Sequence, residues 1–112
     1  MEERYRVSDA IWADIWPRFP KRGPQNEARQ RLFFEAVVFM TRQSLAWRLL
    51  PPSFGNWNSV FVQFNRYSKD GVWERIFEGL KPKHVQELQV DSTSVKAHRH
   101  ASGAPKKRGL NP

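Results

Sequence analysis

Apolar residues recur every three or four positions over most of the chain, a spacing that predicts α-helices with one buried face. Ser8 and Asp9 predict the start of the first helix, because a serine side chain can cap a free backbone amide and an acidic residue is favourable in the first turn. Prolines and glycines after position 16 end it. Further helices are predicted from Gln25 onward, from Ser44 to Leu50, over 56–68 and over 72–80.

The helix predicted from Gln25 has an apolar stripe and a polar side. The stripe consists of Leu32, Phe33, Ala36, Val37 and Met40, whereas Arg29, Glu35 and Arg42 lie opposite. Most aromatic residues of the chain fall on such inward stripes. We therefore interpret them as core, Trp47 and Trp57 included, rather than as stacking platforms for single-stranded nucleic acid.

After Pro82 the pattern changes. The run from Val85 to Asp91 predicts a strand, and the residues from Ser92 to Ala97 could turn and begin a second one. From His98 the sequence is polar, basic and rich in glycine and proline, which predicts disorder. The expected fold class is mainly α, with a helical domain over 1–80 that contains a helix-turn-helix, a short β-hairpin-like segment over 81–97 and a disordered basic tail over 98–112.

Composition narrows the class of partner. The 112 residues fit one small domain, and the 39% apolar share is enough for a compact core. A formal net charge of +8, greatest in the part after residue 80, favours a polyanion as the partner, with nucleic acid as the first candidate.

The absence of cysteine excludes disulfides and thiolate metal sites. No window approaches the ~20 apolar residues of a membrane span, so we expect a cytoplasmic protein with no membrane partner.

Residues 45–69 match the pattern of a helix-turn-helix, in which a short helix, a turn and a longer helix present a polar outer face. Asparagine and glutamine can pair with adenine edges and arginine with guanine, which predicts Asn58, Gln63 and Arg66 as readers of the major groove. Ser59 and Lys69 complete the predicted DNA-binding set. The alternative interpretation is the ordinary solvated face of a helical bundle.

Candidate metal ligands are few. His84, His98 and His100 offer imidazoles, but no carboxylate or third ligand stands at a suitable spacing near them. Asp91 ends the predicted strand, where a carboxylate can be held toward a divalent cation. Asp-Ser-Thr is also favourable turn chemistry, and the residue types alone favour the turn. The basic run at 106–108 could touch phosphates without reading sequence.

Five segments follow one another in a characteristic order along nearly the whole chain. They are Ser8 to Trp12, Trp47 to Pro51, Phe54 to Trp57, Asp70 to Glu74 and Asp91 to His98, the last reading DSTSVKAH. Together they resemble the DDE insertion-sequence transposases, specifically the group whose gene is often split into two overlapping frames.

The resemblance implies a division of labour within the protein. In that family a helical N-terminal domain binds the terminal inverted repeats of the element, and a ribonuclease-H-like α/β domain follows, whose three acidic residues hold two magnesium ions. The resemblance places Asp91 as the first of these acids, a catalytic and metal-binding residue only in an extended protein. Residues 81–97 would then begin a truncated ribonuclease-H-like domain, and the other two acids would lie beyond Pro112.

The expected function is the DNA-binding N-terminal portion of an insertion-sequence transposase, acting in DNA transposition. The expected partner is double-stranded DNA carrying the terminal inverted repeats, with a homodimer or a complex with full-length transposase as further possibilities. We expect no cofactor in this chain, and Mg²⁺ only in the complete transposase. The alternatives are a stand-alone DNA-binding regulator that restrains transposition, and a basic RNA-associated or protein-interaction module unrelated to transposition.

Overall fold

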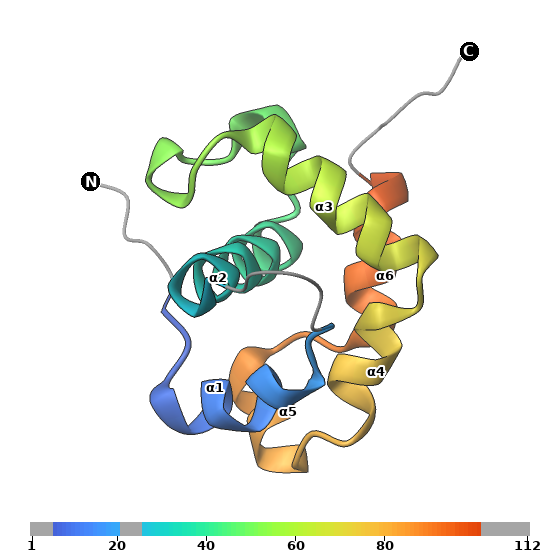
Figure 1. Cartoon of the computed structure of the whole chain (residues 1–112). Helices are drawn as coiled ribbons and strands as arrows, with labels where there is room; N and C mark the ends of the chain where they lie inside the picture. Colours follow the sequence, from blue (N-terminus) through green and yellow to red (C-terminus); the bar gives the residue numbers. More distant parts are fainter. Residues whose placement is uncertain (1–5, 21–25, 102–112) are drawn as a thin grey trace.

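A computed structural model describes residues 6–20 and 26–101, with side chains described as far as His98. Within these ranges every regular element is helical (Figure 1). The α-helices are α1 (Asp9–Ile15), α2 (Glu27–Gln43), α3 (Trp57–Lys69), α4 (Val72–Glu78), α5 (Pro82–Leu88) and α6 (Ser92–Ala101). Three short 3-10 helices accompany them: η1 (Trp16–Arg18), η2 (Trp47–Leu49) and η3 (Pro52–Phe54). The expectation of a mainly helical fold is confirmed.

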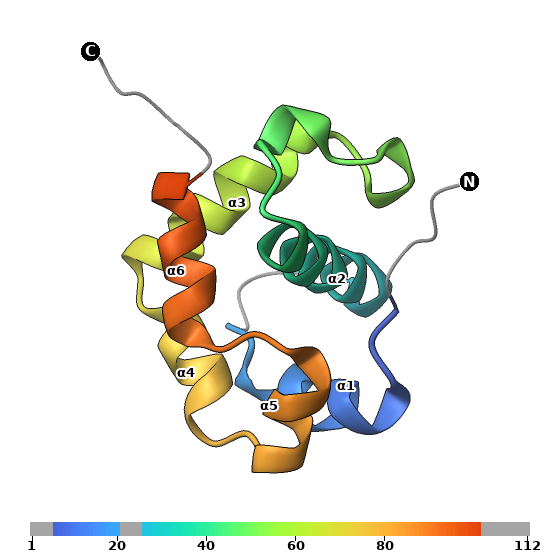
Figure 2. The ribbon, with the colours of Figure 1, turned by 180° about the vertical axis from the view of Figure 1, so that it is seen from behind.

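The longest helix, α2, runs through the middle of the molecule, with α1 and α5 on one side of it and α3 on the other (Figures 1 and 2). α4 and α6 lie side by side, and α6 also contacts α2. The buried face of α2 runs from Phe33 to Val38 and includes Met40. Trp73 of α4 and Phe64 of α3 pack into the same core with no solvent exposure.

The helix ends follow from local side-chain chemistry. Ser8 caps α1 by accepting the amide of Ile11 at 3.2 Å, and Asn26 caps α2 by accepting the amide of Arg29 at 3.1 Å. α2 ends where Ser44 adopts the left-handed conformation with φ 56°. The helices predicted at Ser8, from Gln25, over 56–68 and over 72–80 are all present.

Two predictions about the middle of the chain need correction. The short helix expected from Ser44 to Leu50 is only the 3-10 turn η2, because Pro51 and Pro52 follow at once and neither can extend a helical ladder. Trp47 is buried as expected, whereas Trp57 is 38% exposed at the start of α3.

The strand predicted over Val85 to Asp91, and with it the β-hairpin-like segment, is wrong for the described chain. Pro82 occupies the first turn of α5, where its fixed φ favours a helix and its missing N–H is not needed. Gln89 ends the helix in the left-handed conformation, and Asp91 then starts α6. In a helix, the four-residue spacing puts His84 and Leu88 on the same side, and both are buried. A strand would also put Gln86 on that side, but Gln86 is exposed.

α6 continues through the boundary at which the basic tail was predicted to begin. His98 lies within α6 and is buried, and the helix ends at Ala101. Val90 and Val95 of this part of the chain join the common core. The remainder of the predicted tail, with its basic run at 106–108, lies outside the described residues.

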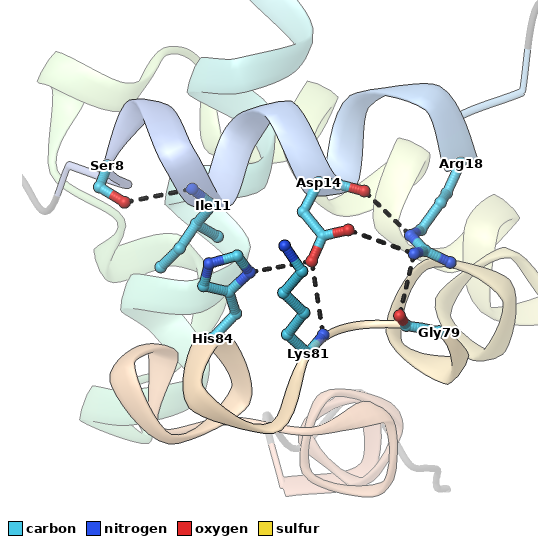
Figure 3. A network of polar contacts seen from close by, with 7 residues as sticks. All are labelled: Ser8, Ile11, Asp14, Arg18, Gly79, Lys81 and His84. Atoms are coloured by element: carbon cyan, nitrogen blue, oxygen red, sulfur yellow. Dashed lines mark hydrogen bonds and ion pairs between the residues drawn. The ribbon is translucent and has the colours of Figure 1, made fainter.

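A polar network ties α1 and η1 to α5 and to the connection between α4 and α5 (Figure 3). Asp14 accepts hydrogen bonds from Nδ1 of His84 at 2.9 Å and from the amide of Lys81 at 3.4 Å. Arg18 pairs with Asp14 at 3.3 Å and donates to the carbonyl of Gly79 at 3.0 Å. Burial opposes ionisation of Asp14, but the hydrogen bonds from His84, Lys81 and Arg18 outweigh it and hold the pKa of Asp14 below its usual value.

His98 gives the fold a pH dependence. Its ring lies against Trp47 with centroids 5.4 Å apart, and burial lowers the pKa of His98 below its ordinary value of 6.5. The unfolded chain therefore takes up a proton at a higher pH than the folded chain does. It follows that the free energy of unfolding falls as the pH drops below 6.5 toward the folded pKa.

We expect His98→Phe to remove this part of the pH dependence while keeping a ring against Trp47. Urea denaturation of both proteins at about pH 7.5 and about pH 5.5 measures it. The native chain should lose more stability on acidification than the variant does. An equal loss in both proteins would mean that His98 does not titrate differently on unfolding.

Candidate nucleic-acid interface

α3 is the helix on which the predicted DNA-binding residues fall. Asn56 fixes its start, because the side-chain oxygen accepts the amides of Asn58 at 2.9 Å and Ser59 at 3.2 Å. The helix ends before Gly71, whose φ of 72° suits a residue without a Cβ. Val60 and Phe64 are buried on its inner side, so the opposite side of α3 has a defined orientation toward solvent.

The five predicted residues divide between two parts of the α3 surface. Asn58, Arg66 and Lys69 are exposed on the outer face. Ser59 is also exposed but lines a groove toward α2, and Gln63 is half-buried at the same groove. The structure therefore brings the five together on one helix but does not present all of them outward.

The outer face of α3 also contains a residue that the sequence interpretation omitted. Val62 is 48% exposed and lies four residues after Asn58 and four before Arg66, at the centre of this face. The helical spacing alone could have identified it. We use the term outer face for Asn58, Val62, Arg66 and Lys69.

The groove between α2 and α3 is a cavity of about 510 Å³. Arg29 and Gln30 of α2 line one side, and Ser59 and Gln63 of α3 line the other. A smaller cavity of about 180 Å³ continues past Gln30 and Gln63 toward Arg66. Polar side chains from two helices therefore meet beside the outer face, and the sequence pattern of α3 alone gave no indication of the α2 contribution.

At the smaller cavity, three side chains form a hydrogen-bonded network between α2 and α3. Oε1 of Gln30 accepts Nε2 of Gln63 at 3.0 Å and the hydroxyl of Tyr67 at 3.4 Å. Tyr67 is itself buried, with its ring edge-on to Phe33 at 5.3 Å. The amide of Gln63 is thus held by the protein rather than free in solvent.

The charge on α3 suits a polyanion. Its thirteen residues from Trp57 to Lys69 include two cations and no carboxylate. Arg66 and Lys69 both lie in the last turn, where cations are favourable beside the helix dipole. Asp70 follows at the C-cap, so the negative charge is confined to the end of the helix.

Asp91 lies elsewhere and acts as a helix cap. Its side chain is exposed and accepts the amide of Ser94 at 2.8 Å, and its carbonyl accepts the amide of Val95 at 3.0 Å. The hydrogen bonds from Ser94 are the main cause of the lowered pKa of Asp91. Asp91 therefore caps α6 in the present chain, whereas the residue types alone had favoured a turn at Asp91, Ser92 and Thr93.

The histidines and acids do not form a metal site in the part of the chain that the structure covers. No group of three or more metal-ligating side chains occurs among the described residues. His84 pairs with Asp14, His98 packs on Trp47, and the side chain of His100 lies outside what is described. Asp91, alone and engaged as a cap, does not fit a pair of magnesium ions, which needs several carboxylates.

Comparison with known proteins decides the family. Residues 7–77, from just before α1 into α4, match the family described as "Putative transposase of IS4/5 family (DUF4096)". The chain belongs to this family. The matched region contains the whole of α3 and its cap, whereas Asp91 lies beyond it.

The transposase-related chain is also similar to two known proteins, one of which is named as an insertion-element protein. "Uncharacterized protein y4sN" from Sinorhizobium fredii (strain NBRC 101917 / NGR234) is 36% identical over 111 residues, covering 90% of this chain and 87% of the relative. The "Insertion element IS402 uncharacterized 16.2 kDa protein" from Burkholderia cepacia is 27% identical over 122 residues, covering 95% of this chain and 80% of the relative. No solved structure matches.

None of the helices within 6–20 and 26–101 is long and apolar enough to cross a membrane.

Proposed function

We propose that this transposase-related chain binds double-stranded DNA at the ends of an insertion element, with α3 as its recognition helix. One observation carries the proposal: a capped and firmly packed helix presents Asn58, Arg66 and Lys69 to solvent and contains no carboxylate. Membership of a transposase family supplies the biological setting, because a transposase must locate the ends of its element. The terminal inverted repeats are the expected target.

The outer face of α3 has the chemistry that major-groove recognition needs. Arginine can pair bidentately with guanine and asparagine with adenine, and an apolar side chain such as Val62 can contact a thymine methyl group. Lys69 is suited to a phosphate at the edge of the groove. A helix fits the major groove, which is about 12 Å wide. In this arrangement η2 and η3 take the place of the first helix and turn of a helix-turn-helix.

Catalysis belongs to a further part of the proposal. By the resemblance, Asp91 serves a DDE active site only after the chain is joined to downstream sequence that supplies the other acids. The present chain is then the DNA-binding N-terminal portion of the enzyme. To bind metal in the extended protein, the Asp91 carboxylate would have to leave its position as a helix cap. Its exposure to solvent is compatible with that change.

The test is a binding titration with a duplex enriched from a randomised pool by the native chain. We expect affinity to fall steeply with salt, because each phosphate contact releases a counterion. Arg66→Gln should cost about 1 to 3 kcal/mol of binding free energy on the enriched duplex and relax its base preference. Lys69→Gln should weaken binding to all sequences and reduce the salt slope by about 1.

Lys83→Gln is the matched control, since Lys83 is exposed on α5, on the side of α2 away from α3 (Figure 1). It removes the same charge and should have a much smaller effect. If Arg66→Gln and Lys69→Gln bind as the native chain does, or if Lys83→Gln weakens binding equally, α3 is not the DNA-binding surface.

A further inference from the structure

We propose that Gln30 of α2 is a positioning residue for base recognition, because it holds the amide of Gln63 in the orientation needed to read one base pair. This inference rests on the proposed DNA-binding function. It deepens that function by adding a residue from outside the recognition helix. Gln30 lies on the face of α2 that adjoins α3, and it lines both cavities beside Gln63.

The geometry carries the inference. Oε1 of Gln30 accepts one N–H from Gln63 at 3.0 Å and the hydroxyl of Tyr67 at 3.4 Å. Tyr67 is fixed by burial between Phe33 and Trp73, with ring centroids 5.3 and 5.4 Å away. The orientation of the Gln63 amide is therefore set through Gln30 by a rigid part of the core.

The remaining hydrogen-bonding capacity of Gln63 matches a purine edge. A glutamine amide has two N–H donors and one oxygen acceptor, and only one donor is used by Gln30. The free N–H and the oxygen are the pair that adenine N7 and N6 require. An amide already held in place loses less conformational freedom on binding than a free surface glutamine does.

The half-buried position of Gln63 accounts for its dependence on Gln30. Its side chain projects into the groove rather than straight outward, so it can reach a base only along a restricted path. Without its hydrogen bond to Oε1 of Gln30, the amide of Gln63 could rotate toward Ser59 or Arg66, which line the two cavities. Discrimination at one base pair should then decline, although the phosphate contacts of α3 remain.

The experiment measures affinities for the enriched duplex and for each of its single base-pair substitutions, at one salt concentration. Gln63→Ala should reduce discrimination at one base pair, by roughly 5- to 150-fold for a bidentate contact. Gln30→Met, which keeps the length but removes the acceptor, should flatten discrimination at the same base pair. Gln86→Met is the matched control, since Gln86 is exposed on α5, away from α3, and it should leave discrimination at that base pair unaffected.

Gln30→Glu separates positioning from a purely structural role. A carboxylate still accepts from Gln63 and Tyr67, so this variant should retain the base preference. Its added negative charge should weaken binding to every duplex alike. The thermal midpoint of each variant is measured in parallel, because a structural role alone would lower it without changing the base preference.

Three results would contradict the role of Gln30 or the DNA-binding function on which it rests. If Gln63→Ala loses discrimination but Gln30→Met keeps it, Gln63 reads the base without help and the inference is overturned. If Gln30→Met loses affinity uniformly over all duplexes, Gln30 only supports the fold, and the inference is again overturned. If the native chain enriches no sequence and shows no salt-dependent affinity, the proposed function itself fails, and this inference fails with it.

Discussion

Trp73→Ala should destabilise the chain by about 3 to 5 kcal/mol, the usual cost of removing a fully buried large aromatic side chain. Trp73 has no solvent exposure and contacts the rings of Phe33, Phe64 and Tyr67. Its loss would leave a cavity where α2, α3 and α4 meet. Urea denaturation followed by circular dichroism measures the change, and a loss below about 1 kcal/mol would contradict the described core.

Trp73→Phe is the matched control for that experiment. The indole Nε1–H is buried and finds no acceptor within the described part of the chain. Phenylalanine keeps an aromatic ring in contact with the same neighbours and removes a buried donor, whose burial without a partner costs about 1 to 3 kcal/mol. The Phe variant should therefore lose much less stability than the Ala variant. A similar loss in both would mean that the indole nitrogen has a partner in solution.

The second large effect concerns Asp91 in an extended protein that includes the downstream sequence. There Asp91→Asn should abolish magnesium-dependent cleavage of element ends, since a neutral amide oxygen binds a divalent cation more weakly than a carboxylate does. Binding of the ends should survive, because α3 is unchanged. A cleavage assay and a binding assay on the same preparation measure the two effects. Cleavage at near the native rate would remove Asp91 from the active site.

In the present chain the same substitution should be almost silent. Asparagine caps a helix about as well as aspartate does, so Asp91→Asn should keep the free energy of unfolding within about 0.5 kcal/mol. Asp91→Ala removes the acceptor for the amide of Ser94 and should cost about 1 kcal/mol. Together these variants separate the capping role from the proposed catalytic one.

Helix positions could be predicted from the sequence where spacing and end chemistry agree. Ser8 at the start of α1 and the apolar stripe of α2 are examples, since both depend on neighbours within one or two turns. The segment after Pro82 was predicted wrongly because Val85 to Asp91 has apolar residues that fit either period. Pro82 at a helix start and Asp91 before three small polar residues would have favoured helices.

Contacts between distant parts of the chain could not be predicted. Glu35 was placed on the polar side of its helix, yet it is buried and accepts the amide of Val7 at 2.9 Å, 28 positions away. The hydrogen bond between Gln63 and Gln30 joins residues 33 positions apart, so the local spacing of residues could not predict it either. For the candidate site, the sequence predicted which helix would bind DNA. Only the structure showed which of its residues lie on the outer face and which line the groove.

A titration of the isotopically labelled chain with the enriched duplex, followed by amide chemical shifts, tests the central claim most directly. We predict that the largest saturable shifts fall on α3, at Asn58, Val62, Arg66 and Lys69, with smaller ones at Gln30 across the groove. The amides of α5 should remain nearly unchanged. Shifts centred on α5 or α1, with α3 unaffected, would contradict the assignment of α3 as the DNA-binding helix.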